Sequence, residues 1–159
     1  MFWLFLLVGC FALGALLGAP WLPIRRREAM VVLELLDLKP GQTVLDLGSG
    51  DGSFLLLAAR RGISGVGYEL NPLLWLYSLG RTWPQRRLVK IHLANYWRVQ
   101  WPPVDGVYVF LINRFMGRLH HKLQRELKSR VPVASYTFTI PDQKPLKSKD
   151  GVYLYYYGE

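Results

Sequence analysis

A glycine-rich segment and two polar residues further along the chain have the types and spacing that could bind a nucleoside. Gly48-Ser49-Gly50-Asp51-Gly52 follows a short apolar run, which predicts a tight loop between a buried strand and a helix. Glycines expose the backbone to a ligand, and free N–H groups at a helix N-terminus favour an anionic group. Glu69 ends the next predicted strand, where a carboxylate can accept hydrogen bonds from both ribose hydroxyls. Asn95 follows the third predicted strand, where its amide can reach a base edge.

The spacing around the loop excludes two common nucleotide sites. A dinucleotide fingerprint needs a third glycine at position 53, where the chain has Ser53. No Gly-Lys-Ser/Thr follows the loop, so nothing is supplied for a triphosphate and its magnesium. Asp46, two residues before the first glycine, would repel a pyrophosphate but attract a sulfonium or an α-ammonium group. The pattern therefore favours a cationic nucleoside.

The elements that must position these residues alternate between strands and helices. Short apolar runs predict strands over 43–47, 65–69, 88–93, 105–112, 131–140 and 151–157. Apolar residues at helical spacing, with glycine and proline at the ends, predict helices over 29–38, 53–61, 71–82 and 115–129. Repeated β-α-β units call for an α/β fold with an open, mostly parallel sheet of about six strands and helices on both faces. Such sheets bind ligands at the carboxyl ends of their strands, where the glycine loop and Glu69 are expected.

An uncharged run at the start of the chain predicts a transmembrane helix. Residues 2–24 are long enough to cross the roughly 30 Å hydrocarbon core of a bilayer. No Lys or Arg precedes the run, and its end lacks a small-x-small cleavage site, so we expect an uncleaved anchor. A buried core helix or a cleaved signal is the alternative interpretation. The chain thus divides into a transmembrane anchor, residues 1–24, and one further domain, residues 25–159.

Basic residues orient the predicted anchor. Arg25, Arg26 and Arg27 follow it directly, which favours a cytoplasmic location for the domain behind them. Because no Arg-rich transit segment is visible, a prokaryotic inner membrane is favoured over an organelle. Without these three arginines the net charge falls from +9 to +6, and the remainder fits a surface lying against anionic lipid. A mean hydropathy of +0.13 is unusual for a nucleic-acid binder.

The cysteine and histidine content argues against a disulfide or a metal site. Cys10 is the single cysteine, so an intramolecular disulfide is excluded. His92, His120 and His121 have no Cys or carboxylate at metal-ligand spacing, and we expect no structural metal. The adjacent pair at 120–121 is interpreted as a solvated helix face rather than as a catalytic pair.

Two motifs resemble those of class I S-adenosylmethionine-dependent methyltransferases. Residues 46–52 are similar to the first motif of that superfamily, and Gly67-Tyr68-Glu69 to its acidic second-strand motif. Four longer segments, residues 20–23, 67–72, 94–97 and 105–110, together resemble a narrower family. It comprises the membrane-anchored protein-lysine methyltransferases of the mitochondrial ATP synthase c-subunit and the adenine nucleotide translocase, with their small prokaryotic relatives. The resemblance covers about residues 20–157 and implies a Rossmann-like class I methyltransferase sheet with S-adenosyl-L-methionine as cofactor.

The resemblance also implies a role for each residue of the site. The methionine end of the cofactor would be lined by Asp46, Gly48, Ser49 and Gly50. Glu69 would hold the ribose, Leu70 would pack on the adenine, and Asn95 with Tyr96 would border the adenine ring.

The acceptor side of the site is less defined by the sequence. Asn113 ends the fourth predicted strand, where the methyl group should emerge, and is a candidate catalytic residue that positions the acceptor. It could equally cap the helix that begins near Phe115. Aromatic residues that could surround an acceptor are Trp21, Tyr96, Phe115 and Tyr136.

These features lead to one principal hypothesis and three alternatives. The principal hypothesis is a membrane-anchored methyltransferase that acts on a lysine of a membrane protein. A second hypothesis is methylation of a small membrane-soluble molecule, such as a quinone or a lipid. A nucleic-acid methyltransferase is less favoured, because residues 111–114 lack the Asn/Asp-Pro-Pro-aromatic tetrapeptide of amino-methylating DNA enzymes. The last alternative is a non-catalytic module that binds the nucleoside without turnover.

Overall fold

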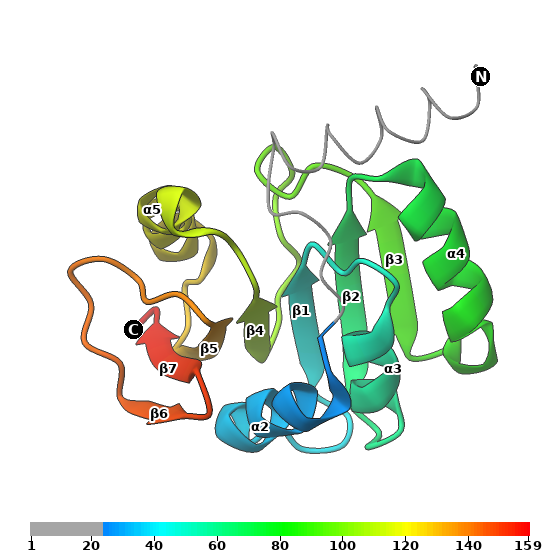
Figure 1. The fold of residues 1–159 in the computed structure, drawn as a ribbon, viewed down its shortest axis with the longest axis horizontal. Coiled ribbons are helices and arrows are strands. Elements are labelled where there is room, and N and C mark those ends of the chain that lie inside the picture. Colours follow the sequence, from blue (N-terminus) through cyan, green and yellow to red (C-terminus); the bar gives the residue numbers. More distant parts are fainter. Residues whose placement is uncertain (1–23) are drawn as a thin grey trace.

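A seven-stranded sheet forms the centre of the protein in a computed structural model that describes residues 24–159 (Figure 1). Its strands are β1 (Thr43–Leu47), β2 (Ser64–Glu69), β3 (Val89–Leu93), β4 (Gly106–Val109), β5 (Val131–Tyr136), β6 (Lys147–Lys149) and β7 (Val152–Tyr157). They lie in the order β3-β2-β1-β4-β5-β7-β6. The first five are parallel, whereas β7 is antiparallel to both β5 and β6.

Helices cover both faces of the sheet, as the sequence predicts. They are α2 (Arg26–Leu36), α3 (Ser53–Ala59), α4 (Pro72–Thr82) and α5 (Met116–Glu126), with short 3-10 turns η1 (Trp83–Gln85) and η2 (Asn113–Phe115). The helices α2, α3 and α4 pack on one face, and α5 packs on the other (Figure 1). Strand β1 contributes to both layers because its side chains alternate: Val44 faces the three-helix layer, and Leu45 and Leu47 face α5.

The sheet has seven strands, one more than the six that the sequence predicts. The additional strand β6 pairs with β7, and the two are joined by a turn at Asp150 and Gly151, both with positive φ (48° and 76°). This is the backbone conformation of a two-residue hairpin turn, for which Asp-Gly is a strong signal. The strand escapes prediction because Lys147–Lys149 contains only exposed polar side chains and so has no apolar pattern.

The predicted membrane anchor lies outside the described residues, apart from Ile24 at its end. Within residues 24–159, none of the helices is both long and apolar enough to span a bilayer. The anchor stays a prediction from the sequence.

A loop rich in aromatic residues connects β3 to β4 on the α5 side of the sheet. Tyr96, Trp97 and Trp101 are each buried there and belong to the same hydrophobic cluster as the inner face of α5. They pack there together with Leu119 and Leu123 of α5. The position of this loop therefore depends on its contacts with α5.

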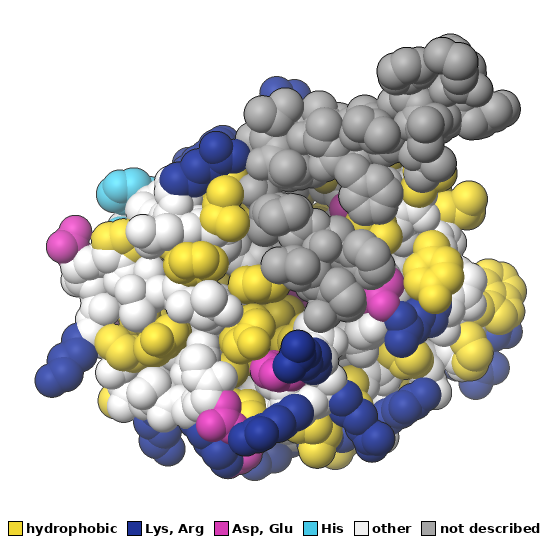
Figure 2. Space-filling model, in the orientation of Figure 1, with side chains coloured by type: hydrophobic (Ala, Val, Ile, Leu, Met, Phe, Trp, Pro, Cys, Tyr) yellow, Lys and Arg dark blue, Asp and Glu magenta, His cyan; other side chains and the backbone are white. Residues whose placement is uncertain are grey.

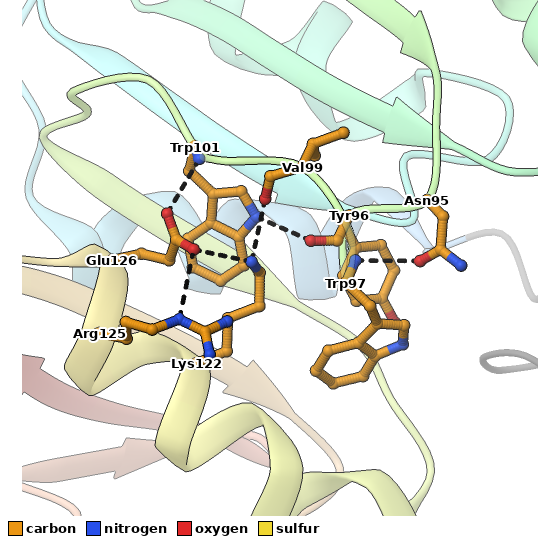
Figure 3. A network of polar contacts seen from close by, with 8 residues as sticks. All are labelled: Asn95, Tyr96, Trp97, Val99, Trp101, Lys122, Arg125 and Glu126. Carbon is orange, nitrogen blue, oxygen red and sulfur yellow. Dashed lines mark hydrogen bonds and ion pairs between the residues drawn. The ribbon is translucent and has the colours of Figure 1, made fainter.

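A buried ion pair on α5 holds the loop in place (Figure 3). The Nζ of Lys122 donates to the Val99 carbonyl at 3.0 Å and to Oε1 of Glu126 at 2.8 Å, and it lies 4.9 Å from the centre of the Trp101 ring. Oε2 of Glu126 accepts a hydrogen bond from the Trp101 backbone N–H at 3.1 Å. The indole N–H of Trp101 in turn donates to the Tyr96 carbonyl. One helix turn thus holds Val99 and Trp101 directly and holds Tyr96 through the Trp101 indole.

Replacing Lys122 with methionine is expected to destabilise the protein by about 3–5 kcal/mol, because Glu126 then keeps a buried charge without its principal partner. The exposed pair between Lys149 and Glu34 provides a matched control, since side chains that are 47% and 59% exposed are strongly screened by water. Lys149→Met is expected to cost less than about 1 kcal/mol. Denaturant unfolding of both variants measures the difference, and equal costs would contradict a stabilising role for the buried pair.

Candidate active site

The glycine loop lies at the carboxyl end of β1, where the strand order reverses between β2 and β4. This is the switch point at which open α/β sheets bind ligands. The backbone N–H groups of Gly48 and Ser49 both donate to the Tyr68 carbonyl, at 3.0 and 2.9 Å, so the loop is held against the end of β2. Gly48 has a φ of 90°, and an added Cβ there would meet no atom of residues 24–159 within 4 Å, so these residues leave space beside the loop.

Gly67 on β2 lets the loop approach the strand, a role that the sequence reasoning missed. A Cβ at this position would lie 2.7 Å from the Oγ of Ser49 and 2.7 Å from Cδ1 of Leu55. Real side chains do not tolerate such contacts, so a larger residue would displace either the loop or α3. The signal was available, because glycine in the interior of a strand often marks a close approach of another backbone.

Glu69 joins the glycine loop to the start of α4. Its side chain is buried, with Oε2 accepting from the Gly50 N–H at 2.8 Å and Oε1 accepting from the Asn71 N–H at 2.7 Å. Burial raises the pKa of Glu69, and the backbone N–H groups of Asn71 and Gly50 oppose that shift. Each carboxylate oxygen can accept a second hydrogen bond, so Glu69 can still accept from the two hydroxyls of a ribose.

Asp46 is a second buried carboxylate at this end of the sheet. It is 3% exposed, and its pKa is raised well above the ordinary value by burial, then by the nearby charges of Glu69 and Asp51. Asp51 is engaged elsewhere: it accepts hydrogen bonds from Ser53 at the start of α3 and forms an ion pair with Arg81 of α4. A cation bound here would favour the ionised forms of Asp46 and Glu69, and their attraction to it would stabilise a cationic ligand.

Ser49 lies beside these carboxylates with an unused polar atom. Its Oγ is buried and, in the described part of the chain, has no hydrogen-bond partner. A buried hydroxyl without a partner is costly, which favours a ligand that supplies one. The structure thus brings together Asp46, Ser49, Glu69 and the backbone of Gly48 and Gly50. Their chemistry suits the cationic methionine end and the ribose of S-adenosylmethionine, and their binding of that cofactor stays a prediction.

Residues expected to border an adenine ring follow β2 and β3. Leu70 is half-buried between β2 and α4. The Oδ1 of Asn95 accepts a hydrogen bond from the Trp97 N–H at 3.0 Å, so this atom shapes the loop, and the side-chain NH₂ is the group that can reach a base. Tyr96 is buried, and burial raises its pKa, with Arg118 opposing the shift and Glu69 adding to it. Its place near Glu69 agrees with a position beside the nucleoside.

The predicted acceptor aromatics divide between the two faces of the sheet. Phe115 lies on the α5 side, with its ring 6.2 Å from that of Trp97, and Trp97 lies 4.8 Å from Tyr96. Tyr136 packs instead against Phe110, 5.1 Å away, in the cluster on the opposite face. Tyr96, Trp97 and Phe115 therefore form the aromatic group next to the site, whereas Trp21 lies outside the described residues.

Asn113 is exposed at the carboxyl end of β4, as the first residue of η2. The residues at the N-cap positions of η2 and α5 are Ile112 and Phe115, and neither helix has a side-chain cap. The alternative role of Asn113 as a helix cap is therefore not seen. Its role in positioning an acceptor stays a prediction.

The two adjacent histidines have different surroundings. His121 is exposed, whereas His120 is half-buried with Nδ1 2.7 Å from the Tyr157 hydroxyl. Burial and the neighbouring His121 lower the pKa of His120. His120 therefore packs α5 against β7. Among residues 24–159, no three His, Cys, Asp or Glu side chains lie close enough together to hold a metal ion.

The substitution Asp46→Asn is expected to stabilise the protein without a ligand and to weaken its binding of S-adenosylmethionine. A carboxyl whose pKa is raised by folding destabilises the fold wherever the unfolded chain would ionise it, so the gain should be present near neutral pH and vanish below about pH 4. Loss of one charge-assisted contact should lower affinity by about tenfold to a hundredfold. Thermal unfolding near neutral pH and below about pH 4 measures the change in stability. Titration calorimetry measures the change in affinity for S-adenosylmethionine.

Asp105→Asn provides the control, because Asp105 lies at the opposite end of β1, where its Oδ2 accepts from the Thr43 N–H. This variant should bind S-adenosylmethionine like the unmodified protein. If the Asp46 variant and the unmodified protein bind S-adenosylmethionine with equal affinity, Asp46 does not contribute to the cofactor site.

Similarity to known proteins agrees with this geometry. A family model described as "ANTKMT methyltransferase domain" matches residues 46–147. The human lysine N-methyltransferase of the ATP synthase c-subunit is 34% identical over 128 residues, which cover 79% of this chain. The chain spans about half of that protein's length (54%). A protein-lysine N-methyltransferase of Saccharolobus islandicus is 30% identical over 156 residues, covering 88% of this chain and 94% of the relative.

Solved structures share the fold. An RNA methyltransferase from Salinibacter ruber, in complex with S-adenosyl-L-homocysteine, superposes with a TM-score of 0.79 and 26% identity over 86% of this chain and 92% of that one. A SAM-dependent methyltransferase from Geobacter sulfurreducens, bound to the same product, has a TM-score of 0.61 and 23% identity over 76% and 53% of the two chains. The matched family model spans the glycine loop, Glu69 and Asn95, and the chain belongs to the ANTKMT methyltransferase domain family.

Proposed function

We propose that this protein transfers a methyl group from S-adenosylmethionine to a lysine of a membrane protein. The observation that carries the proposal is the pair of buried carboxylates, Asp46 and Glu69, beside a glycine loop at the switch point of the sheet. When bound there, S-adenosylmethionine supplies an electrophilic methyl group. The chain's own residues bind the cofactor and align the acceptor, and such alignment can lower a barrier by roughly 7–11 kcal/mol.

The aromatic group beside the site suits an amine acceptor. A lysine must lose a proton before it can attack a methyl group, and an apolar environment lowers the pKa of an amine. Tyr96, Trp97 and Phe115 supply apolar surface, and the Arg118 guanidinium lies 4.4 Å from the centre of the Trp97 ring. A positive charge at this position also disfavours an ammonium ion. Asn113, at the end of β4, is the residue that would orient the incoming amine.

The names of the relatives support a lysine acceptor. The human relative is named as a lysine methyltransferase of the ATP synthase c-subunit, and the Saccharolobus relative as a protein-lysine methyltransferase. The membrane part of the proposal rests on the uncharged run at residues 2–24, which would anchor the domain of residues 25–159 on the cytoplasmic side of a prokaryotic inner membrane. Confinement to the membrane raises the local concentration of membrane-bound acceptors.

RNA is a second candidate acceptor. It is favoured by the likeness to the RNA methyltransferase of Salinibacter ruber and by the net charge of +9. The lysine acceptor is preferred because the named lysine methyltransferases are more similar in sequence. Quinones and lipids are further candidate acceptors for a methyl group from the same cofactor site. The non-enzymatic alternative is a module that binds the nucleoside without turnover.

The substitution Glu69→Gln should reduce affinity for S-adenosylmethionine by about tenfold to a hundredfold, because a charge-assisted acceptor for the ribose is lost. Transfer of labelled methyl groups to membrane proteins should fall with it. Calorimetry on the full chain in detergent measures binding, and peptide mass spectrometry locates methylated lysines. Glu34→Gln is the control, since Glu34 is an exposed carboxylate of α2 paired with Lys149.

Failure of the unmodified protein to bind S-adenosylmethionine would overturn the enzymatic proposal. Label found in RNA or in extracted lipids, with none in protein, would keep the methyltransferase and change its acceptor. Binding with no labelled product in any of these fractions would favour the non-enzymatic alternative.

A further inference from the structure

The outer face of α4 and η1 is apolar although it is exposed. Four residues, Leu73, Leu76, Tyr77 and Trp83, are 40%, 63%, 60% and 63% exposed, and we call them the α4 stripe. Their spacing places them along one side of the helix and its continuation into η1. A helix that packs on a sheet normally has polar residues on its outer side, and packing among residues 24–159 does not account for this apolar face. Figure 2 shows apolar side chains over α4, at the right of the view, with Lys and Arg side chains beside them.

The inner side of α4 is already satisfied by the sheet. Trp75 and Leu79 pack in the three-helix layer, and the Trp75 indole N–H donates to the Ile91 carbonyl on β3 at 3.0 Å. Ser78 and Thr82 are buried on the same side. The apolar content of the stripe is therefore additional to what the core requires, and exposed apolar patches of this kind mark interaction sites.

The segment that contains the stripe carries only basic charged side chains, of which Arg81 is paired with Asp51 of the glycine loop. Residues 70–104 contain no Asp or Glu, and their Lys and Arg residues are Arg81, Arg86, Arg87, Lys90 and Arg98. Arg86 and Arg87 follow η1 and are exposed, and the Arg86 guanidinium lies 4.8 Å from the centre of the Trp83 ring. An aromatic residue with an arginine stacked on it suits a boundary between apolar and anionic groups. The charge pattern therefore calls for a partner that is both apolar and anionic.

The start of the described chain lies on the same helix-covered face of the sheet as α4. Ile24 lines a surface pocket together with Arg26 of α2, Ser53 and Arg60 of the α3 region, and Arg81 of α4. Ile24 is also the last residue of the uncharged run that begins at residue 2. That run therefore joins the domain on the face of the sheet that α2, α3 and α4 cover, and a bilayer that holds the run would lie on the same side as the stripe.

We propose that the α4 stripe docks onto the surface of a membrane that contains anionic phospholipids. Leu73, Leu76, Tyr77 and Trp83 would enter the interface, where Tyr and Trp side chains are favoured, and Arg86 with Arg87 would bind lipid phosphates. The inference rests on the membrane location in the proposed function and adds an orientation to it. A second copy of the chain fits the stripe poorly, because the two faces would bring like charges together.

Docking would fix the active site relative to the bilayer. Helix α4 begins at Pro72, which only Leu70 and Asn71 separate from Glu69, and the Asn71 side chain caps the helix by accepting from the Leu73 N–H at 2.9 Å. A membrane held against α4 is thus connected rigidly to the carboxylate that binds the cofactor. An acceptor lysine would then be reached at a defined height above the bilayer.

A fluorescent probe at a single cysteine tests the docking surface in the full chain. Cys10→Ser removes the native thiol, and Leu76→Cys introduces a labelling position on the stripe. Leu146→Cys is the matched control, because Leu146 is 62% exposed near the β6 strand. In vesicles of phosphatidylcholine with phosphatidylglycerol, the probe at 76 should shift to the blue and be quenched by lipid-borne nitroxides, and the probe at 146 should do neither.

Charge reversal tests whether the anionic lipids contribute to docking of the stripe. Arg86→Glu with Arg87→Glu should abolish the blue shift at position 76, whereas Lys128→Glu with Lys144→Glu, an equal charge change elsewhere on the surface, should preserve it. Calorimetric binding of S-adenosylmethionine should be unchanged by either pair. In vesicles of phosphatidylcholine alone, the shift at 76 should be smaller.

Three results would overturn the docking surface. If the protein is incorporated in vesicles but the probe at 76 stays in water, the chain is anchored and the stripe does not dock. A blue shift that appears without vesicles and grows with protein concentration assigns the stripe to a second copy. If the protein does not associate with vesicles, both the anchor and the docking are wrong. Calorimetric binding of S-adenosylmethionine then tests the methyltransferase proposal separately.

Discussion

The site depends on keeping two carboxylates buried without full compensation. Asp46 and Glu69 lie at the ends of adjacent strands, and burial raises the pKa of both. Two backbone N–H groups hold Glu69, and these come from Gly50 in the loop and Asn71 before α4. The same hydrogen bonds that stabilise the carboxylate therefore fix the glycine loop and the start of α4. Ionising these carboxyls is costly without a partner, and a cationic ligand at this edge would lower that cost.

Other parts of the structure support that arrangement from a distance. Gly67 provides the space that lets the loop lie on β2, and the Tyr68 carbonyl holds it there. On the opposite face, the buried pair of Lys122 and Glu126 holds the aromatic loop after β3, which carries Asn95 and Tyr96. The two halves of the expected nucleoside site are thus built by different layers of the protein. Both converge at the carboxyl edge of the sheet because parallel strands end on the same side.

Local patterns in the sequence predict the parts of the fold that depend on neighbouring residues. The strand over 43–47 has the bounds that the structure gives, and the loop behind it is correctly placed, because apolar runs and glycines act locally. The strand Lys147–Lys149 could not be found from apolar periodicity, although the Asp-Gly turn behind it was readable. Lys122 resembles any solvated lysine in sequence, and its burial depends on contacts with the distant loop at Val99 and Trp101. Tyr136 was expected near an acceptor, but side-chain alternation along β5 places it on the other face.

The affinity for S-adenosylmethionine as a function of pH tests the central account most directly. If buried carboxylates with raised pKa values bind the cation, affinity measured by calorimetry should fall as the pH is lowered from neutrality toward about 4, and the fall should begin above the range in which ordinary carboxyls titrate. The fall should be smaller in the Asp46→Asn variant, where one of the two titrating groups is absent. An affinity that is constant over this range in the unmodified protein would contradict the account.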